Sequence, residues 1–416
     1  MVRGILISLF SLAGFVVNSQ TLFSKTFGGE RYDHGRSIIE THDSLYVICG
    51  STSSFNNYDP DVYLIKSDSL GNYIWSRAIG GTGFQQGNQV IETKDSGYAV
   101  VGHAFPGFNG AYDALVMRTD SAGNLLWTAE IGGSDWDFGK DIIENNDGTF
   151  LITGYTYSNS NGDADMMLAK LSPGGTLLWT RNIGGASNDE AHAIIRHTND
   201  TIYIAGTSQS FGYGGSDMTL CAINEFGDSL WCKNYGGALD ESAYDMIESV
   251  DGSVSLFGST SSFGAGQLDM WLIDVTPQGD SIWSQRYGGA DDDEGFFLCQ
   301  NPNGDYFIGG YSVSFGTMDG YLDWLMYKVS GTGIFFHGLS YGFFYDDAGY
   351  DCIYTFDDAL MAVGDVTDVG YGGSDVVLKR IEQLTLQHDT SYTNFYDVLT
   401  IDEPIGATVQ IYPNPA

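Results

Sequence analysis

The chain has 416 residues, 43% of them hydrophobic, and its 53 acidic against 17 basic residues give a formal net charge of −36 at pH 7. A field of that sign opposes binding to DNA, RNA or an anionic lipid surface, so nucleic acid is not an expected partner. The hydrophobic content suffices for a large core, and 56 glycines favour a fold with many turns.

The N-terminal segment, residues 1–19, has the pattern of a secretory signal peptide. Arg3 supplies the positive charge, residues 4–17 are apolar but too short to span a membrane, and small residues precede Gln20 as a cleavage site. Elsewhere the sequence has no apolar run long enough for a transmembrane helix. We therefore expect an exported protein without a membrane span.

A pair of glycines recurs every 52 residues through most of the chain, and a period near 50 residues indicates a propeller, a solenoid or an array. The pairs are Gly28-Gly29, Gly80-Gly81, Gly132-Gly133, Gly184-Gly185, Gly236-Gly237 and Gly288-Gly289, with a degenerate seventh copy at Tyr341-Gly342.

One repeat, taken over residues 137–185, contains four short apolar runs separated by turn residues. The expected strands are 141–144, 150–154, 166–171 and 177–183, with turns at 146–148 and 173–175 and a longer loop at 157–164. No run has a helical period. Four short strands per repeat are typical of a propeller blade.

The two ends of the repeat region indicate how the ring closes. Residues 22–27 form a fourth strand with no blade before it, whereas residues 347–381 supply only three strands. We therefore predict an all-β fold, a seven-bladed β-propeller of four-stranded blades over residues 20–381, in which the N-terminal strand completes the last blade. We expect it to be a monomer.

Acidic residues recur in two sets of loops that an up-and-down blade places on one face. Two carboxylates per blade, with carbonyl oxygens of glycine-rich loops, are ligands that suit Ca²⁺. The alternative is that these carboxylates accept backbone N–H groups and fix turns. The candidate metal ligands are Asp33, Asp61, Asp137, Asp165, Asp189, Asp217 and Asp293.

The loops between the second and third strands vary most from blade to blade and combine aromatic residues with Asn, Ser and Asp. Aromatic rings can stack on sugars while amides and carboxylates bind hydroxyl groups, so we expect a glycan or a protein to bind this acidic, aromatic face. The candidate contact residues are Tyr58, Phe108, Trp136, Tyr213 and Tyr321.

No motif for a serine nucleophile, a zinc protease or a phosphate-binding loop occurs. We therefore favour a non-catalytic binding or scaffold propeller over an enzyme. One alternative is a polysaccharide lyase or glycosidase on the same face, and the other is a purely structural spacer. The enzyme would use residues that break the repeat pattern, namely Trp136, His34, His192, Asp292 and Glu294.

Of the five cysteines, Cys221 and Cys232 flank a turn at residues 226–227. Their side chains could meet across two strands and form a disulfide in an oxidising compartment.

The last residues, 409–416, read Val-Gln-Ile-Tyr-Pro-Asn-Pro-Ala. This segment resembles the start of the C-terminal sorting domain of the type IX secretion system of Bacteroidota, here truncated, and residues 382–408 would be a linker. The alternative is an ordinary proline-rich tail. The repeats over residues 22–381 resemble secreted seven-bladed propeller repeat proteins of the same phylum. These resemblances imply export by the type IX machinery and a secreted or outer cell-surface location.

Overall fold

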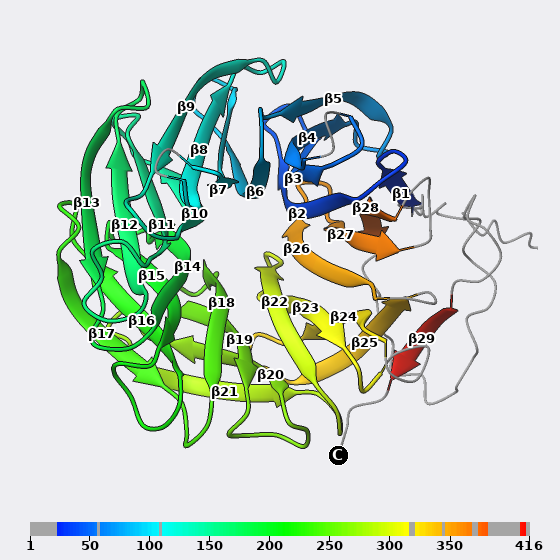
Figure 1. Cartoon of the computed structure of the whole chain (residues 1–416). Coiled ribbons are helices and arrows are strands. Elements are labelled where there is room, and N and C mark those ends of the chain that lie inside the picture. The colour runs from blue at the N-terminus through cyan, green and yellow to red at the C-terminus, as the bar shows by residue number, and fades with distance from the viewer. Residues whose placement is uncertain are drawn as a thin grey trace, which may run out of the picture.

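The computed structural model describes residues 23–55, 59–107, 110–315, 321–342, 346–367, 373–381 and 408–412. These residues form a ring of seven antiparallel sheets around a central channel (Figure 1). These seven sheets confirm the predicted seven-bladed β-propeller. No helix that could cross a membrane is found among the described residues.

The first four blades each contain four consecutive strands. Blade 1 has β2 (Asp33–Glu40), β3 (Tyr46–Thr52), β4 (Asp61–Ser67) and β5 (Tyr73–Ile79). Blade 2 has β6 (Phe84–Glu92), β7 (Tyr98–Phe105), β8 (Asp113–Thr119) and β9 (Leu125–Ile131). Blade 3 has β10 (Asp137–Glu144), β11 (Phe150–Thr156), β12 (Asp165–Leu171) and β13 (Leu177–Ile183). Blade 4 has β14 (Asp189–Arg196), β15 (Ile202–Ser208), β16 (Asp217–Ile223) and β17 (Ser229–Tyr235).

The last three blades complete the ring. Blade 5 has β18 (Glu241–Glu248), β19 (Val254–Thr260), β20 (Asp269–Val275) and β21 (Ser281–Tyr287). Blade 6 has β22 (Asp293–Gln300), β23 (Tyr306–Ser312), β24 (Asp323–Val329) and β25 (Phe335–Gly342), with β29 (Thr408–Tyr412) added antiparallel to β25. Blade 7 has β26 (Ala348–Tyr354), β27 (Leu360–Thr367) and β28 (Ser374–Ile381), and its fourth strand is β1 (Phe23–Phe27).

The N-terminal strand closes the ring as predicted. β1 pairs antiparallel with β28, from Phe23 opposite Arg380 to Phe27 opposite Val376. The predicted signal peptide, residues 1–19, and residues 382–407 of the predicted linker lie outside the described residues. The boundaries of both segments therefore stay predictions.

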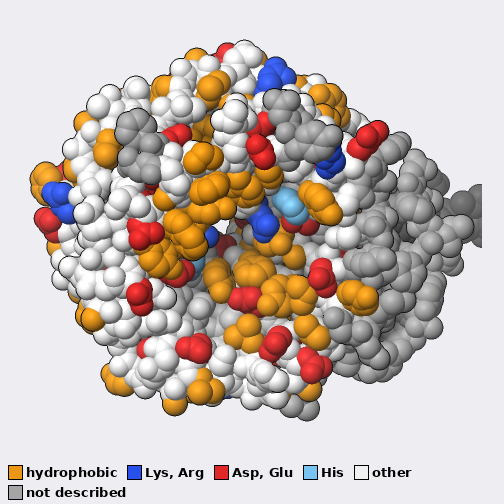
Figure 2. Space-filling view, viewed as in Figure 1, with side chains coloured by type: hydrophobic (Ala, Val, Ile, Leu, Met, Phe, Trp, Pro, Cys, Tyr) orange, Lys and Arg blue, Asp and Glu red, His pale blue; other side chains and the backbone are white. Residues whose placement is uncertain are grey.

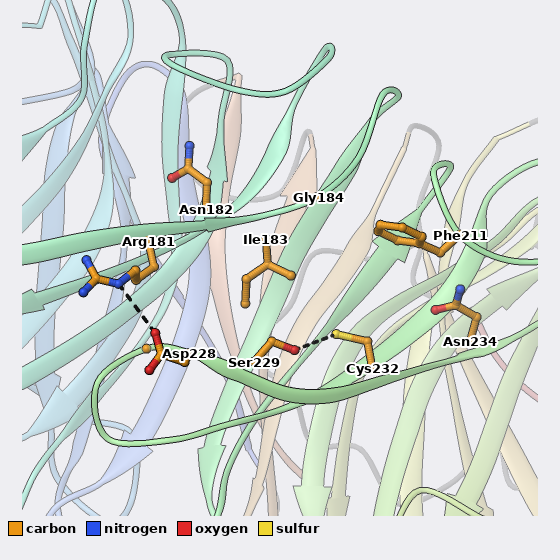
Figure 3. Close-up of a pocket in the computed structure, with 10 residues that line it drawn as sticks. Arg181, Asn182, Ile183, Gly184, Phe211, Asp228, Ser229, Cys232 and Asn234 are labelled. Carbon is orange, nitrogen blue, oxygen red and sulfur yellow. Dashed lines mark hydrogen bonds and ion pairs between the residues drawn. The ribbon is translucent and has the colours of Figure 1, made fainter.

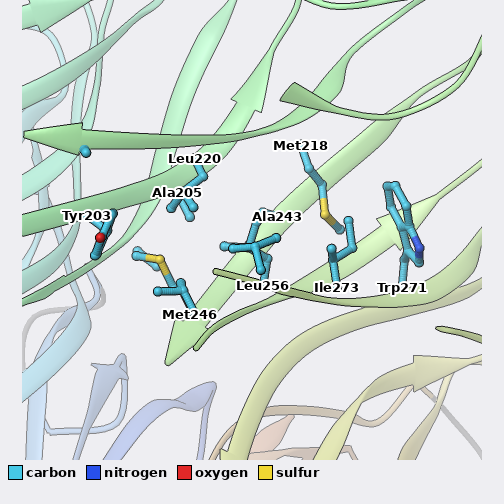
Figure 4. Packing of buried hydrophobic residues seen from close by; sticks show 13 residues of the cluster. Tyr203, Ala205, Met218, Leu220, Ala243, Met246, Leu256, Trp271 and Ile273 are labelled. Atoms are coloured by element: carbon cyan, nitrogen blue, oxygen red, sulfur yellow. The ribbon is translucent and has the colours of Figure 1, made fainter. Parts of the chain in front are cut away.

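The core lies between neighbouring blades. One cluster, for example, joins Tyr203 and Leu220 of blade 4 to Met246 and Leu256 of blade 5 (Figure 4). The repeated tryptophans pack between blades as well: Trp75 of blade 1 lies against Gly123 in the β8–β9 turn, where a Cβ atom would stand 2.8 Å from the indole. Gly123 also has a φ of 77°, a conformation that favours glycine. Both the close indole and the backbone conformation therefore require glycine at this position.

Candidate binding site at the channel mouth

The two sets of loops that the sequence assigns to one face do share it. The backbone N–H of Tyr157, after β11, donates to the carbonyl oxygen of Trp136 at 2.8 Å, and that of Asp137 donates to the carbonyl oxygen of Tyr112 in the preceding blade at 2.7 Å. The Gly-Gly loops and the loops between second and third strands therefore form one surface around the channel, here called the loop face.

The first-strand carboxylates fix the Gly-Gly loops. Asp137 is buried, and its Oδ2 accepts the backbone N–H of Gly133 at 2.8 Å and the hydroxyl of Ser158 at 2.9 Å. The equivalent loop bond, 2.6–2.7 Å long, is made to Asp33, Asp189 and Asp293.

The third-strand carboxylates are buried too. Asp165 accepts the backbone N–H of Asn161, and Asp217 that of Tyr213, both at 2.9 Å. Burial raises the pKa of Asp165, and neighbouring Asp189 adds to the rise. Asp61 occupies the same place in blade 1 and is equally buried. All seven candidate metal ligands are thus buried, so they do not contribute to an acidic surface on the loop face.

The described part of the chain has no group of three or more His, Cys, Asp or Glu side chains arranged to hold a metal ion. The contacts of these carboxylates are those expected for fixing turns. Calcium binding stays a prediction.

The three aromatic candidates among the described residues lie on different blades. Trp136 is 51% exposed and contacts the rings of Tyr112 and Tyr157, with centroids 6.1 and 6.2 Å away. Tyr213 and Tyr321 are exposed on the loops of blades 4 and 6. Tyr58 and Phe108 lie outside the described residues. Ring contacts connect Trp136 through Tyr157 and Tyr155 to His192 of the channel wall.

A β-bulge, which the sequence reasoning missed, shapes the channel wall. The first strand of every blade carries a register shift that leaves one extra residue between two paired ones, for example Lys140 between Gly139 and Asp141. A bulge re-aims a side chain, and bulges are frequent next to functional sites. The seven bulge residues, here called the bulge ring, are Arg36, Asn88, Lys140, His192, Tyr244, Phe296 and Tyr350.

The bulge explains a difference from the predicted strands. In the third repeat the apolar run begins at residue 141, whereas β10 begins at Asp137. Residues 137–140 belong to the strand, but they lack the alternating apolar pattern by which a strand is recognised.

The bulge ring is divided into two halves. Blades 1 to 4 contribute polar side chains, and blades 5 to 7 contribute Tyr244, Phe296 and Tyr350. The rings contact one another from blade to blade: the centroids of Tyr244 and Phe296 are 5.3 Å apart, and those of Phe296 and Tyr350 are 5.9 Å apart. Figure 2 shows side chains of the hydrophobic class, which includes tyrosine, gathered around the central hollow.

A polar pocket of about 210 Å³ opens between blades 4 and 5 beside this ring. It is lined by Asn188, Glu190, His192, Thr207, Gln209, Ser216, Ser242 and Tyr244. His192 Nε2 lies 3.7 Å from Glu190 Oε2, and the hydroxyl of Tyr244 donates to Glu294 Oε1 at 2.7 Å. Two of the irregular sequence positions, His192 and Glu294, thus contact residues of this pocket, and Trp136 is connected to His192 through the rings of Tyr157 and Tyr155.

The ionisation of this pocket follows from its enclosure. Burial lowers the pKa of His192 to about 3, with Lys140 acting in the same direction, so the imidazole is neutral at pH 7. Burial raises the pKa of Glu190 and, together with Glu294, that of Tyr244. Of the other irregular residues, His34 Nδ1 lies 2.8 Å from Asp365 Oδ2, and the carbonyl oxygen of Asp292 accepts the N–H of Val313.

A larger pocket, of about 570 Å³, lies away from the channel between the outer strands β13 and β17 (Figure 3). Arg181 and Asp228, whose charged atoms are 4.0 Å apart, stand at one side, and Phe211 stands at the other. Cys232 also lines it, and its disulfide with Cys221 confirms the predicted cross-strand pairing.

Comparison with known protein families finds none that matches the chain. Among curated proteins, the chain is 27% identical over 193 residues to the regulatory protein FlaEY of Caulobacter vibrioides, which covers 40% of this chain and 20% of that protein. The chain therefore spans about a fifth of the length of this curated relative.

Among solved structures, puromycin hydrolase is similar with a TM-score of 0.52 at 10% identity, over 84% of this chain and 52% of that one. An ulvan lyase gives a TM-score of 0.47 at 9% identity, over 85% and 95% of the two chains. At these identities the likeness concerns the propeller fold alone.

Proposed function

We propose that this chain is a non-catalytic binding propeller that captures a carbohydrate at the loop-face mouth of its channel. The observation that carries the proposal is the run of contacting aromatic rings in the bulge ring beside a pocket lined only by polar side chains. Ring faces stack on sugar C–H surfaces, and the pocket offers donors and acceptors for hydroxyl groups. Export to the cell surface is part of the proposal and rests on the sequence of residues 1–19 and 409–416.

The pKa directions of two pocket side chains, His192 and Tyr244, support binding over acid–base chemistry. A general acid or base works best with a pKa near the operating pH. The pKa of His192 is lowered to about 3 and that of Tyr244 is raised above its ordinary value. Neither side chain is poised to exchange protons near pH 7.

The test is depletion of the purified chain from solution by a panel of insoluble polysaccharides. Trp136→Ala removes the exposed ring at the rim of the site. Phe356→Ala is the matched control, because Phe356 is 75% exposed in the β26–β27 turn on the opposite face. Retention on one polysaccharide that is lost in Trp136→Ala and kept in Phe356→Ala supports the proposal. If no polysaccharide retains the chain, the carbohydrate assignment is wrong, and a protein partner or a spacer role takes its place.

A further inference from the structure

Two basic side chains of the bulge ring share the channel mouth of a strongly acidic protein. Arg36 projects from blade 1 and Lys140 from blade 3, and both are half-buried. Burial lowers the pKa of Lys140, Glu190 opposes the change, and the charge of Arg36 adds to it. Burial, together with the positive charges of Lys140 and Arg36, lowers the pKa of His103 to about 3. The two cations therefore act on one region of the channel.

Among the described residues, neither cation has an anionic partner closer than 4.0 Å. Within the described ranges, Lys140 forms no ion pair or hydrogen bond, and its ammonium group lies 5.4 Å from the ring centre of Tyr155. Arg36 stacks on Tyr350 at 3.8 Å, and its Nη2 is 4.0 Å from Asp365 Oδ2. Both oxygens of Asp365 have nearer partners, since Oδ1 accepts the N–H of Gly35 and Oδ2 faces His34, each at 2.8 Å.

The carboxyl groups next to the bulge in the first strands bind backbone N–H groups rather than these two cations. Asp141, Asp245 and Asp351 each accept a backbone N–H from another blade, that of Ile194, Leu298 and Ile38 respectively. Burial raises their pKa values to about 7, 6 and 8, so at pH 7 Asp141 is about half protonated, Asp245 is mostly ionised and Asp351 is mostly protonated.

The geometry points to an acidic sugar as the ligand, with its carboxylate or sulfate bound by Arg36 and Lys140. This inference rests on the proposed carbohydrate binding. One half of the bulge ring offers cationic donors, which suit anionic oxygen atoms, and the other half offers aromatic rings, which suit a sugar face. An uncharged sugar leaves Lys140 without an anion, and an anion without a sugar leaves the rings of Tyr244 and Phe296 unused.

The experiment compares three soluble probes by calorimetry: oligogalacturonate, its fully methyl-esterified form, and a sulfated galactan oligomer. We expect one of the two acidic probes to bind at least tenfold more tightly than the ester, and the better one shows whether the group is a carboxylate or a sulfate. Lys140→Met should weaken that binding about tenfold. Lys233→Met removes one charge from the outer strand β17, where Lys233 pairs with Asp280, and should change nothing.

The possible failures are distinct. If the ester binds as tightly as both acidic probes, or if Lys140→Met and Lys233→Met bind alike, the anion site is wrong and carbohydrate binding stands. If none of the probes binds and no polysaccharide retains the chain, both proposals are wrong.

A separate observation concerns two cysteines of neighbouring blades. Cys299 in β22 and Cys352 in β26 are both buried and unpaired, and their sulfur atoms are 2.8 Å apart. This is only about 0.8 Å longer than a disulfide bond. Burial raises the pKa of the Cys352 thiol well above its usual value, so in the folded ring it is a poor nucleophile.

We also propose that Cys299 and Cys352 form a disulfide that joins blades 6 and 7 when the chain folds in an oxidising compartment. The two thiols lose two protons and two electrons as the sulfur–sulfur bond forms, and a thiol–disulfide oxidant takes up both and is reduced to two thiols. Because the folded thiols are enclosed, the bond would form before the last blade docks.

The test is refolding of the full chain in a glutathione redox buffer, followed by denaturation, alkylation with iodoacetamide and intact-mass measurement. With the Cys221–Cys232 and Cys299–Cys352 disulfides both formed, we expect one adduct, on Cys49. Cys352→Ser should give two adducts, and peptide mapping should place the second on Cys299. Three adducts on the refolded wild-type chain, with Cys299 and Cys352 both alkylated, would overturn the proposal.

Discussion

Gly80 lies directly against the carboxylate of Asp61: a Cβ atom on Gly80 would overlap Oδ1 of Asp61. The next residue, Gly81, would have nothing within 4 Å of such an atom. The first glycine of the pair in blades 2 to 5 is likewise in contact with the third-strand Asp of its own blade. The Gly-Gly series and the Asp series therefore share a period of 52 residues because they form one contact at each junction between blades.

This contact predicts that the two glycines differ in their tolerance of a side chain. We expect Gly80→Ala to lower the free energy of unfolding by about 1–3 kcal/mol, because a methyl group must displace a buried carboxylate. Gly81→Ala should change it by less than about 0.5 kcal/mol. Urea unfolding followed by tryptophan fluorescence measures both. Equal losses in the two variants would show that the contact with Asp61 is not the cause.

Ring closure by β1 predicts a large cost for removing its buried side chain. Phe27 pairs with Val376 and packs in the cluster that contains Ile38, so it joins blade 7 to blade 1. We expect Phe27→Ala to cost about 3 kcal/mol in the free energy of unfolding. Phe226→Ala is the control, since Phe226 is an exposed turn residue. If urea midpoints fall equally in both variants, β1 does not hold the ring closed.

The buried carboxyl groups predict a pH dependence of stability. Burial raises the pKa of Asp351 to about 8, and Asp245 adds to the rise. The folded chain then holds a proton that the unfolded chain releases near pH 4, so the contribution of Asp351 to stability is present at low pH and is lost as the pH rises to about 8.

Asp351→Asn stays neutral at every pH. We expect its free energy of unfolding, relative to that of the wild type, to rise between pH 5 and pH 8. The rise should exceed about 1.4 kcal/mol, the value of a tenfold change in proton affinity. Asp120→Asn serves as control: hydrogen bonds from Asn124 lower the pKa of exposed Asp120, so it stays ionised in this range. A parallel offset for Asp351→Asn at both pH values would contradict the assignment.

The fold was predictable because its signals are local and repeated. Gly132-Gly133, the Asn146-Asp147-Gly148 turn and Trp127 each report on one blade, and six further copies of the pattern give the number of blades. The unpaired strand near Phe23 indicated the closure, because a single strand at one end matched a missing strand at the other. Strand alternation and turn residues suffice for this inference.

The site was less predictable because it depends on what differs between repeats. Arg36 and Lys140 are 104 residues apart in the sequence and line one channel only when the ring closes. Each is a bulge residue, and a bulge interrupts the alternation that identifies strand faces. One signal was present: the position after the recurring Gly or Ala of the first strand, at Gly35, Gly139 and Ala191, holds a different residue in almost every blade. The candidate acidic residues behave differently, because they recur at the same position of each repeat. Such recurrence indicates a role in stabilising the fold rather than in a single site.

The aromatic half of the bulge ring predicts different results for two changes at Tyr244. Its hydroxyl donates to Glu294 Oε1 at 2.7 Å, and its ring lies between those of His192 and Phe296. Tyr244→Phe keeps the ring but leaves Glu294 without this donor, so we expect binding of the retained polysaccharide to weaken only two- to fivefold. Tyr244→Ala also removes the stacking surface, worth about 0.5–1.5 kcal/mol, and together with the lost hydroxyl should weaken binding about tenfold.

Affinity electrophoresis in gels that contain the polysaccharide measures both variants. Tyr73→Ala is the matched control, because Tyr73 is an exposed ring on the outer strand β5. Circular dichroism must show the same thermal midpoint for Tyr244→Phe and the wild type, since the ring keeps its packing. If Tyr244→Ala binds as tightly as Tyr73→Ala, the sugar does not stack on this wall of the channel, and the exposed ring of Trp136 at the rim would have to carry the contact alone.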